Sequence, residues 1–207
     1  MFSEIEFFFA IAILIMSVVI HEVSHGFSAN ALGDPTARLQ GRLTLNPLKH
    51  LDPIGSIIVP ATTYLIGGFI FGWARPVPYN PYNLKNQKWG PGAVAAAGPL
   101  ANILIAIIFG LIIRFGAANG FISDAFLKIT ASIVFINIIL AVFNLIPIPP
   151  LDGSKVFFAL LPYRWRHLQI FLEQYGFFIL LIFIFFFWSI ILPIVFGLFQ
   201  LITGLGF

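Results

Sequence analysis

Apolar runs long enough to cross a lipid bilayer dominate this chain and restrict the folds open to it. Of its 207 residues, 59% are hydrophobic and only 9% are charged, whereas a soluble globular domain carries about 25% charged residues. A bilayer offers no water to an exposed backbone, so a spanning segment needs a helix of roughly 20 apolar residues. We therefore predict an all-α polytopic membrane protein of about five to six membrane segments embedded in the lipid bilayer.

The apolar runs follow one another at residues 7–31, 54–72, 90–113, 125–146 and 170–207. The last run is longer than one span, so we expect either a second helix that turns back after Pro193 or a re-entrant tail. No polar stretch is long enough to form a soluble domain. Residues 1–207 should therefore be one domain, and any regulatory or adaptor module must be a separate chain.

Two connections between the runs carry the alternating pattern of short strands. Residues 42–45 alternate as Arg-Leu-Thr-Leu, and Val77 and Tyr79 alternate with prolines in the second connection. We predict a short strand or hairpin at the first position and an edge strand at the second. The second must be an edge strand because proline has no backbone N–H to donate to a neighbouring strand. Strands of this kind have free edges that an extended peptide can pair with.

Three ionisable side chains lie within five positions of the first apolar run, namely His21, Glu22 and His25. Four residues apart on a helix, the two histidines project from one face and can converge on one metal ion, with Glu22 beside them as a base. Each such group costs about 2.5–3.5 kcal/mol inside a membrane, and a shared metal would explain all three. The alternative is a buried polar cluster without metal.

A catalytic zinc takes three protein ligands, so this histidine pair needs a third. The chain has no cysteine, which leaves histidine and the carboxylates. Asp152 is the best candidate, because it follows a proline-rich break where an unpaired carboxylate would be costly. Alternatively, Asp152 only caps a helix beginning at Gly153. His50 and Glu173 are weaker candidates, and both His50 and His167 have the polar or charged neighbours of a solvated surface histidine.

Asparagines interrupt the apolar runs at Asn102, Asn137 and Asn144. Each could hold spans together by hydrogen bonding, and for the first two this reading and a functional one are equally supported. For Asn144 we favour function, because it lies shortly before Asp152 and its amide could stabilise a developing oxyanion. The phenylalanine-rich residues 177–188 are interpreted as a lipid-facing stripe.

These motifs resemble those of the site-2 protease family of intramembrane zinc metalloproteases. The first two matches are His21-Glu22-Val23-Ser24-His25 and Asn144-Leu145-Ile146-Pro147-Ile148-Pro149-Pro150-Leu151-Asp152-Gly153, and Gly98-Pro99-Leu100-Ala101-Asn102 resembles a third recurrent element. The resemblance covers residues 7 to about 160, and as a minimal form the chain departs from several members of the family in lacking a PDZ or CBS module. It implies a single transmembrane metalloprotease domain with a catalytic core at about 7–160 and C-terminal membrane helices at about 168–207.

The resemblance further implies one Zn²⁺ per chain, bound by His21, His25 and Asp152. Glu22 would be the general base, and Asn144 would lie near the reacting carbonyl.

A shared metal site also constrains the topology. His25 and Asp152 both lie near the C-terminal ends of their runs, so these runs must point the same way and an odd number of crossings must separate them. Residues 90–113 supply one crossing, and residues 54–72 should add none, as a re-entrant segment or one recrossed by the chain after Trp73. Most lysines and arginines then fall on one face, which the positive-inside rule makes cytoplasmic. We expect a prokaryotic cell membrane with the active site nearer that face.

The expected reaction is hydrolysis of a peptide bond within or near a transmembrane segment of a membrane-protein substrate. A helix hides its carbonyls, so the substrate must be extended, and we expect Leu43, Thr44, Leu45 and Val77, with Asn102, to bind it. The net charge of +3 suits lipid head groups, and no basic run suits nucleic acid. The alternatives are a membrane metal-ion transporter and a non-catalytic membrane binding protein. A transporter needs ligands spread along a path, whereas these gather at one depth.

Overall fold

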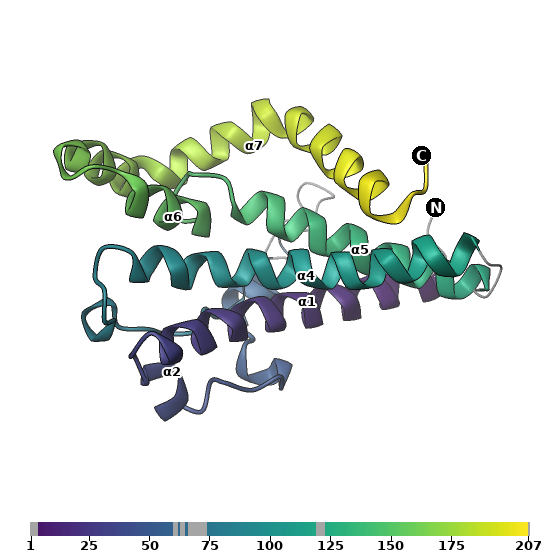
Figure 1. Ribbon diagram of the computed structural model, residues 1–207, viewed down its shortest axis with the longest axis horizontal. Coiled ribbons are helices and arrows are strands. Elements are labelled where there is room, and N and C mark those ends of the chain that lie inside the picture. The colour runs from purple at the N-terminus through teal and green to yellow at the C-terminus, as the bar shows by residue number, and fades with distance from the viewer. Residues whose placement is uncertain (1–3, 60–61, 63–64, 66–73, 119–122, 207) are drawn as a thin grey trace.

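The computed structural model is mostly helical, and four of its helices are long and apolar enough to cross a membrane (Figure 1). It describes residues 4–59, 62, 65, 74–118 and 123–206. The four helices are α1 (Glu4–Ala31), α4 (Gly90–Ala118), α5 (Asp124–Asn144) and α7 (Arg166–Thr203). The predicted helical membrane class is confirmed, with four candidate spans in the described part of the chain where about five to six segments were expected.

Short elements connect these helices. They are α2 (Thr36–Leu39), η1 (Pro47–Lys49), η2 (Ile54–Ile58), η3 (Pro81–Asn83), α6 (Asp152–Leu160) and η4 (Tyr163–Trp165). The helix ends follow local chemistry. The Ser123 hydroxyl accepts the amide of Phe126 at the start of α5, and Gly204, with φ of 76°, ends α7 in the left-handed conformation.

Helix α4 is the centre of the bundle and contacts α1, α5, α6 and α7. Lipid tails are as apolar as leucine, so helices associate in a membrane through close packing and hydrogen bonds. Small residues on α4 permit that approach: a Cβ at Gly110 would overlap the side chain of Ile202 on α7, and Ala106 is fully buried. The largest apolar cluster joins α4, α5 and α7 through Ala106, Ile113, Val134, Ile138, Leu180, Ile191, Val195 and Phe199.

The directions of the helices are those that a shared site requires. Helices α1 and α5 run the same way, and α4 runs in the opposite direction between them in sequence (Figure 1). The C-terminal part of α1 and the segment after α5 therefore lie at the same end of the bundle.

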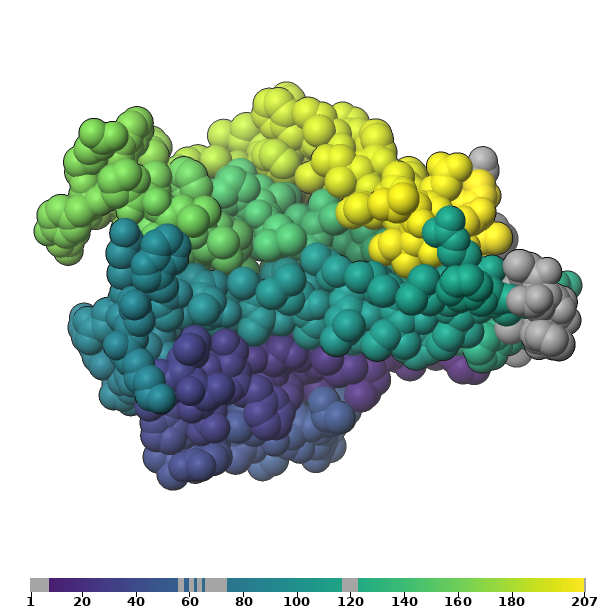
Figure 2. Space-filling model, viewed as in Figure 1, coloured from purple at the N-terminus to yellow at the C-terminus, as the bar shows by residue number. Residues whose placement is uncertain are grey.

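Helix α7 forms a ridge along one edge of the molecule (Figure 2). Several of its phenylalanines stand outward as a lipid-facing stripe requires, with Phe178, Phe185 and Phe186 exposed, whereas Phe183 packs against the apolar cluster. The alternative of a second helix that turns back after Pro193 is wrong, because α7 continues through that residue to Thr203. Proline removes one helical hydrogen bond and bends a helix without having to end it, and α7 bends near its middle in Figure 1.

The two predicted strands are absent from the described residues. Residues 42–45 and 74–80 are irregular or extended, and they are joined by a side chain instead of a backbone ladder: Nη2 of Arg42 donates to the carbonyls of Arg75 and Pro76, at 3.0 and 3.3 Å. The prolines of the second segment lack the N–H groups that a ladder needs. The predicted re-entrant run at residues 54–72 lies largely outside the described residues, beyond η2.

One buried carboxylate holds residues 74–80, the extended segment, against the end of α1. Asp34 is fully buried, and its oxygens accept the amide of Asn80 at 2.6 Å, the side-chain amide of Asn83 at 2.8 Å and the hydroxyl of Thr36 at 2.6 Å. Burial alone would raise the pKa of this carboxyl, but the hydrogen bonds from Thr36, Asn83 and Asn80 outweigh it, so the pKa is lowered. The stabilisation is therefore present above the unfolded pKa and lost as the pH falls through the folded pKa.

We predict that Asp34→Ala destabilises the protein by roughly 2–4 kcal/mol, because it leaves several donors without their charged acceptor. Thermal unfolding in detergent, followed by tryptophan fluorescence, measures this, and trypsin should cut more readily at Lys85 and Lys88. The control is Asp124→Ala, which removes an exposed carboxylate at the start of α5 and should cost about 1 kcal/mol or less. Equal effects of the two substitutions would contradict this role for Asp34.

Candidate metal centre

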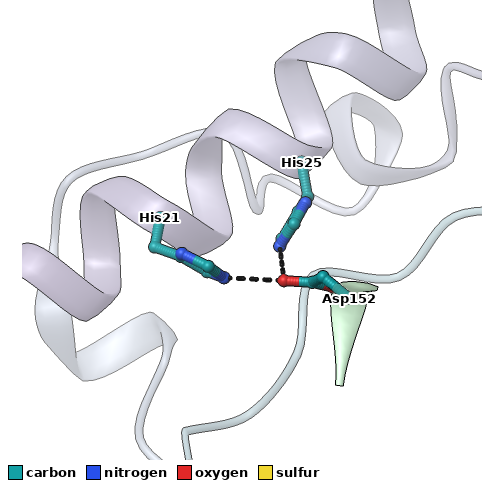
Figure 3. A group of neighbouring side chains, drawn as sticks. All are labelled: His21, His25 and Asp152. Atoms are coloured by element: carbon teal, nitrogen blue, oxygen red, sulfur yellow. Dashed lines mark hydrogen bonds and ion pairs between the residues drawn. The ribbon is translucent and has the colours of Figure 1, made fainter. Parts of the chain in front are cut away.

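Two histidines of α1 and the first residue of α6 converge on one point (Figure 3). Nε2 of His21 lies 3.0 Å and Nε2 of His25 lies 3.2 Å from Oδ2 of Asp152. The possible ligand atoms all lie within 4.8 Å of one another. Both imidazoles are buried at 6% and 9% exposure, so the side chains predicted as ligands meet away from the surface.

The hydrogen bonds on the far side of each ring determine which nitrogen carries the hydrogen. Nδ1 of His25 lies 2.8 Å from the backbone carbonyl of Val94, and Nδ1 of His21 lies 2.6 Å from Oδ1 of Asn102. Both partners accept, so both Nδ1 atoms donate and both Nε2 atoms present a lone pair. Metal-binding histidines are commonly held in this way.

Three electron-pair donors therefore point at one another. Two imidazole lone pairs and a carboxylate oxygen repel unless a cation lies between them, either a proton or a metal ion. Two histidines and one carboxylate match the ligand set of hydrolytic metal sites, which keep a fourth position open. The donor chemistry of His21, His25 and Asp152 thus fits a divalent metal ion.

Asp152 reaches the histidines from the loop that follows α5. Leu151 is the N-cap of α6, and the Asp152 carboxylate bonds the two imidazoles, so the alternative in which Asp152 only caps a helix is not what the structure shows. The loop turns tightly: a Cβ at Gly153 would overlap the carbonyl of Leu145. Burial alone would raise the pKa of the Asp152 carboxyl, but the hydrogen bonds to His21 and His25, and the positive charge of these rings when the shared cation is a proton, outweigh it and lower that pKa.

Glu22 lies beside His21, His25 and Asp152 in the wall of one cleft. Its Oε2 accepts the backbone amide of Val77 at 2.8 Å. The cleft has a volume of about 190 Å³ and is lined by His21, Glu22, His25, Pro76, Val77, Tyr79, Val94, Ala95, Asn144, Pro150, Leu151, Asp152 and Lys155. A carboxylate in a cleft beside a metal site can serve as a general base.

Comparison with known proteins agrees with this geometry. Residues 116–187 match the family model of Peptidase family M50. A Bacillus subtilis (strain 168) protein named "Putative zinc metalloprotease YwhC" is 40% identical over 179 residues, which cover 82% of this chain and 76% of that protein. The chain belongs to peptidase family M50. The family predicted from the two motifs is thereby confirmed.

Two further relatives are more distant. "Putative zinc metalloprotease Rip2" of Mycolicibacterium smegmatis is 33% identical over 71% of this chain and 55% of its own length. "Zinc metalloprotease MJ0392" of Methanocaldococcus jannaschii is 27% identical over 76% of this chain and 35% of its own length. No solved structure matches the chain significantly.

Not every residue predicted for the M50 site lies at it. Asn144 and Val77 line the cleft, whereas Leu43, Thr44 and Leu45 do not. Leu43 instead packs near Gly26, where an added Cβ would lie 2.6 Å from its Cδ2.

Asn102 is fully buried, does not line the cleft, and contacts His21, so it lies away from the position where we predicted that it would bind substrate.

The weaker ligand candidates lie elsewhere. Glu173 and His167 are exposed on α7. The interpretation of His50 as a solvated surface residue is wrong, because His50 is 1% exposed and its Nε2 donates to the carbonyl of Thr44 at 2.9 Å. Its polar neighbours in sequence do not prevent burial, because the Thr44 carbonyl accepts from one ring nitrogen, while the other, Nδ1, has no hydrogen-bond partner within the described part of the chain.

Gly98 is a site residue that the sequence motif alone does not explain. A Cβ at Gly98 would lie 2.5 Å from Nε2 of His25 and 2.6 Å from Nε2 of His21. The space that glycine leaves on α4 is therefore occupied by the two imidazoles. Besides its place in the Gly98-Pro99-Leu100-Ala101-Asn102 element, the sequence showed only a glycine within an apolar run, and such glycines usually mark close packing.

We predict that Gly98→Ala lowers the metal affinity at least about tenfold, because the methyl group displaces both rings. Metal content after dialysis against a chelator measures this. Gly197→Ala is the matched control: it also lies in a membrane helix, nothing lies within 4 Å of its added Cβ, and it should keep the wild-type metal content. Wild-type metal binding by Gly98→Ala would show that the rings do not need this space.

Proposed function

We propose that this chain is a membrane-embedded zinc protease that cleaves a peptide bond within or near a transmembrane segment of another membrane protein. The observation that carries the proposal is the convergence of two Nε2 lone pairs and the Asp152 carboxylate beside Glu22, in a cleft among apolar helices. Membership of family M50 and the names of its relatives support the same chemistry.

His21, His25 and Asp152 would hold the zinc ion, which supplies a Lewis acid for the scissile carbonyl and the attacking water. Glu22 takes the proton from that water and passes it to the leaving amine nitrogen. The amide of Val77 occupies Oε2 of Glu22, which leaves Oε1 to exchange the proton. A backbone donor that holds a catalytic carboxylate in place reduces the cost of orienting it.

The size of the cleft supports an unwound substrate. A volume of about 190 Å³ is smaller than a single helical turn, which at a diameter of about 10–12 Å and a pitch of about 5.4 Å fills roughly 400–600 Å³. A substrate helix must therefore open before its carbonyl can enter, and unwinding also frees that carbonyl from its internal hydrogen bond. The extended residues 74–80 beside the cleft offer backbone groups that an unwound peptide can pair with.

Asn144 is placed to assist at the carbonyl. Its Nδ2 donates one hydrogen to the carbonyl of Leu140 at 2.9 Å, and its amide carries a second hydrogen. Because Asn144 also lines the cleft, that second hydrogen is available for the oxygen that becomes negative in the transition state.

The orientation in the membrane is also part of the proposal. Lys and Arg residues gather in the connections at the end of the bundle that carries the site, namely Arg38, Arg42, Lys49, Arg75, Lys85, Lys88, Lys155, Arg164 and Arg166. By the positive-inside rule this end faces the cytoplasm of a prokaryotic cell. Water would then reach the cleft from the cytoplasmic side.

We predict that Glu22→Gln keeps zinc and loses proteolysis, at least about 10²-fold, because the amide cannot take a proton. Wild type and Glu22→Gln are expressed in matched bacterial cells, and new protein termini in the membrane fraction are identified by mass spectrometry. Termini inside apolar segments that only wild type produces would support the proposal. The corresponding proteins then become substrates for assay with purified enzyme.

Other results would point elsewhere. Termini found only in polar loops would contradict cleavage near transmembrane segments. Zinc bound equally by both proteins, with no difference in termini, would indicate a non-catalytic binding protein, and zinc flux into liposomes would indicate a transporter. Absence of zinc from both would remove the proposed site itself.

A further inference from the structure

A row of hydrogen-bonded buried side chains, two amides and a hydroxyl, lies behind His21 between the membrane helices. Asn102 of α4 and Asn137 of α5 are 0% exposed, and Ser17 of α1 is 4% exposed. Nδ2 of Asn102 donates to Oδ1 of Asn137 at 2.7 Å and to the carbonyl of Ser17 at 3.4 Å. Nδ2 of Asn137 donates to Oγ of Ser17 at 2.9 Å and to the carbonyl of Ile133 at 2.8 Å.

Two backbone carbonyls determine which amide atoms donate and which accept in this row of hydrogen bonds. A carbonyl can only accept, so the Asn137 atom beside Ile133 must be its NH₂ group, and the Asn137 oxygen must then face Asn102. That oxygen and the Ser17 carbonyl both require the NH₂ group of Asn102. The remaining Asn102 atom, Oδ1, therefore faces Nδ1 of His21 at 2.6 Å as an acceptor.

We propose that Asn102 is a positioning residue for zinc binding: oriented by Asn137, it holds His21 in the form that keeps hydrogen on Nδ1 and a lone pair on Nε2. His25 obtains the same control from the backbone carbonyl of Val94, which no substitution removes. His21 depends on a side chain. If the amides served only to join helices, the Asn102–Asn137 and Asn137–Ser17 bonds would suffice, and Oδ1 of Asn102 would need no imidazole.

Two substitutions of Asn102 separate positioning from packing. Asn102→Leu has a similar volume and removes the acceptor, whereas Asn102→Asp keeps an oxygen towards His21 and disturbs the bond to Asn137. Asn137→Leu removes the oxygen that orients Asn102, together with the bond to Oγ of Ser17, and leaves the Asn102–His21 contact itself in place. Thr130→Val is the control on α5, where it removes a 1% exposed hydroxyl that bonds the carbonyl of Phe126. Each purified variant is titrated with Zn²⁺ against a chromophoric chelator, and its Co²⁺ absorption spectrum and metal-free melting temperature are recorded.

Positioning predicts that Asn102→Leu weakens Zn²⁺ binding about 10–100-fold, the range found when partners of ligating histidines are removed. Its Co²⁺ bands should shift, because the His21 ring is no longer oriented. Asn137→Leu should lose about tenfold. Asn102→Asp should bind Zn²⁺ close to wild type even though its metal-free melting temperature falls, and Thr130→Val should keep both affinity and spectrum.

The inference rests on the proposed zinc site and is independent of proteolysis. It would be overturned if Asn102→Leu bound Zn²⁺ as tightly as wild type with an unchanged Co²⁺ spectrum. It would also be overturned if both Asn102→Leu and Asn102→Asp lost Zn²⁺ affinity to the extent that their metal-free melting temperatures fell. Loss of packing alone explains that pattern. If Asn102→Leu does not fold, the same criteria apply to Asn137→Leu. A wild type that bound no Zn²⁺ would refute the proposed function and this inference together.

Discussion

The structure depends on the register between two antiparallel helices, α1 and α4. Ser17, His21 and His25 are four residues apart on one face of α1, and Val94, Gly98 and Asn102 are four apart on one face of α4. Ser17 meets Asn102, both imidazoles fill the space at Gly98, and His25 meets Val94. A shift of one helix by a single turn would remove every one of these contacts, so the metal site and the packing of the two helices are one arrangement.

The other half of the site depends on packing remote from it. The large apolar cluster of α4, α5 and α7 holds α5 against α4, and this fixes where α5 ends and where the Asp152 loop begins. The polar contacts contribute little cohesion by comparison, since a hydrogen bond between membrane helices is worth about 0.6–2 kcal/mol. Apolar packing thus positions the helices, and the polar groups determine the direction in which the histidine nitrogens point.

The site residues that could be predicted from the sequence are the ionisable ones, because burying such a group in a membrane has a high free-energy cost that needs an explanation. His21, Glu22 and His25 share a helical turn, and Asp152 is a carboxylate at the end of an apolar run, so periodicity and charge revealed them. Gly98 and Asn102 act through distances between helices, which no periodicity within one helix encodes. The strand prediction at residues 76–79 failed because alternation describes side chains, whereas a sheet also needs backbone donors that Pro76 and Pro78 lack.

The extended segment links the base to the exterior of the bundle. Its residue Val77 holds Glu22, and three residues later Asn80 is held by the buried Asp34. Because Pro76, Val77 and Tyr79 of the same segment line the cleft, the backbone amide that holds Glu22 lies in the wall of the cleft. A peptide that pairs with this segment would therefore be aligned against Glu22 by the contacts that admit it, which couples entry of an unwound strand to the orientation of the base.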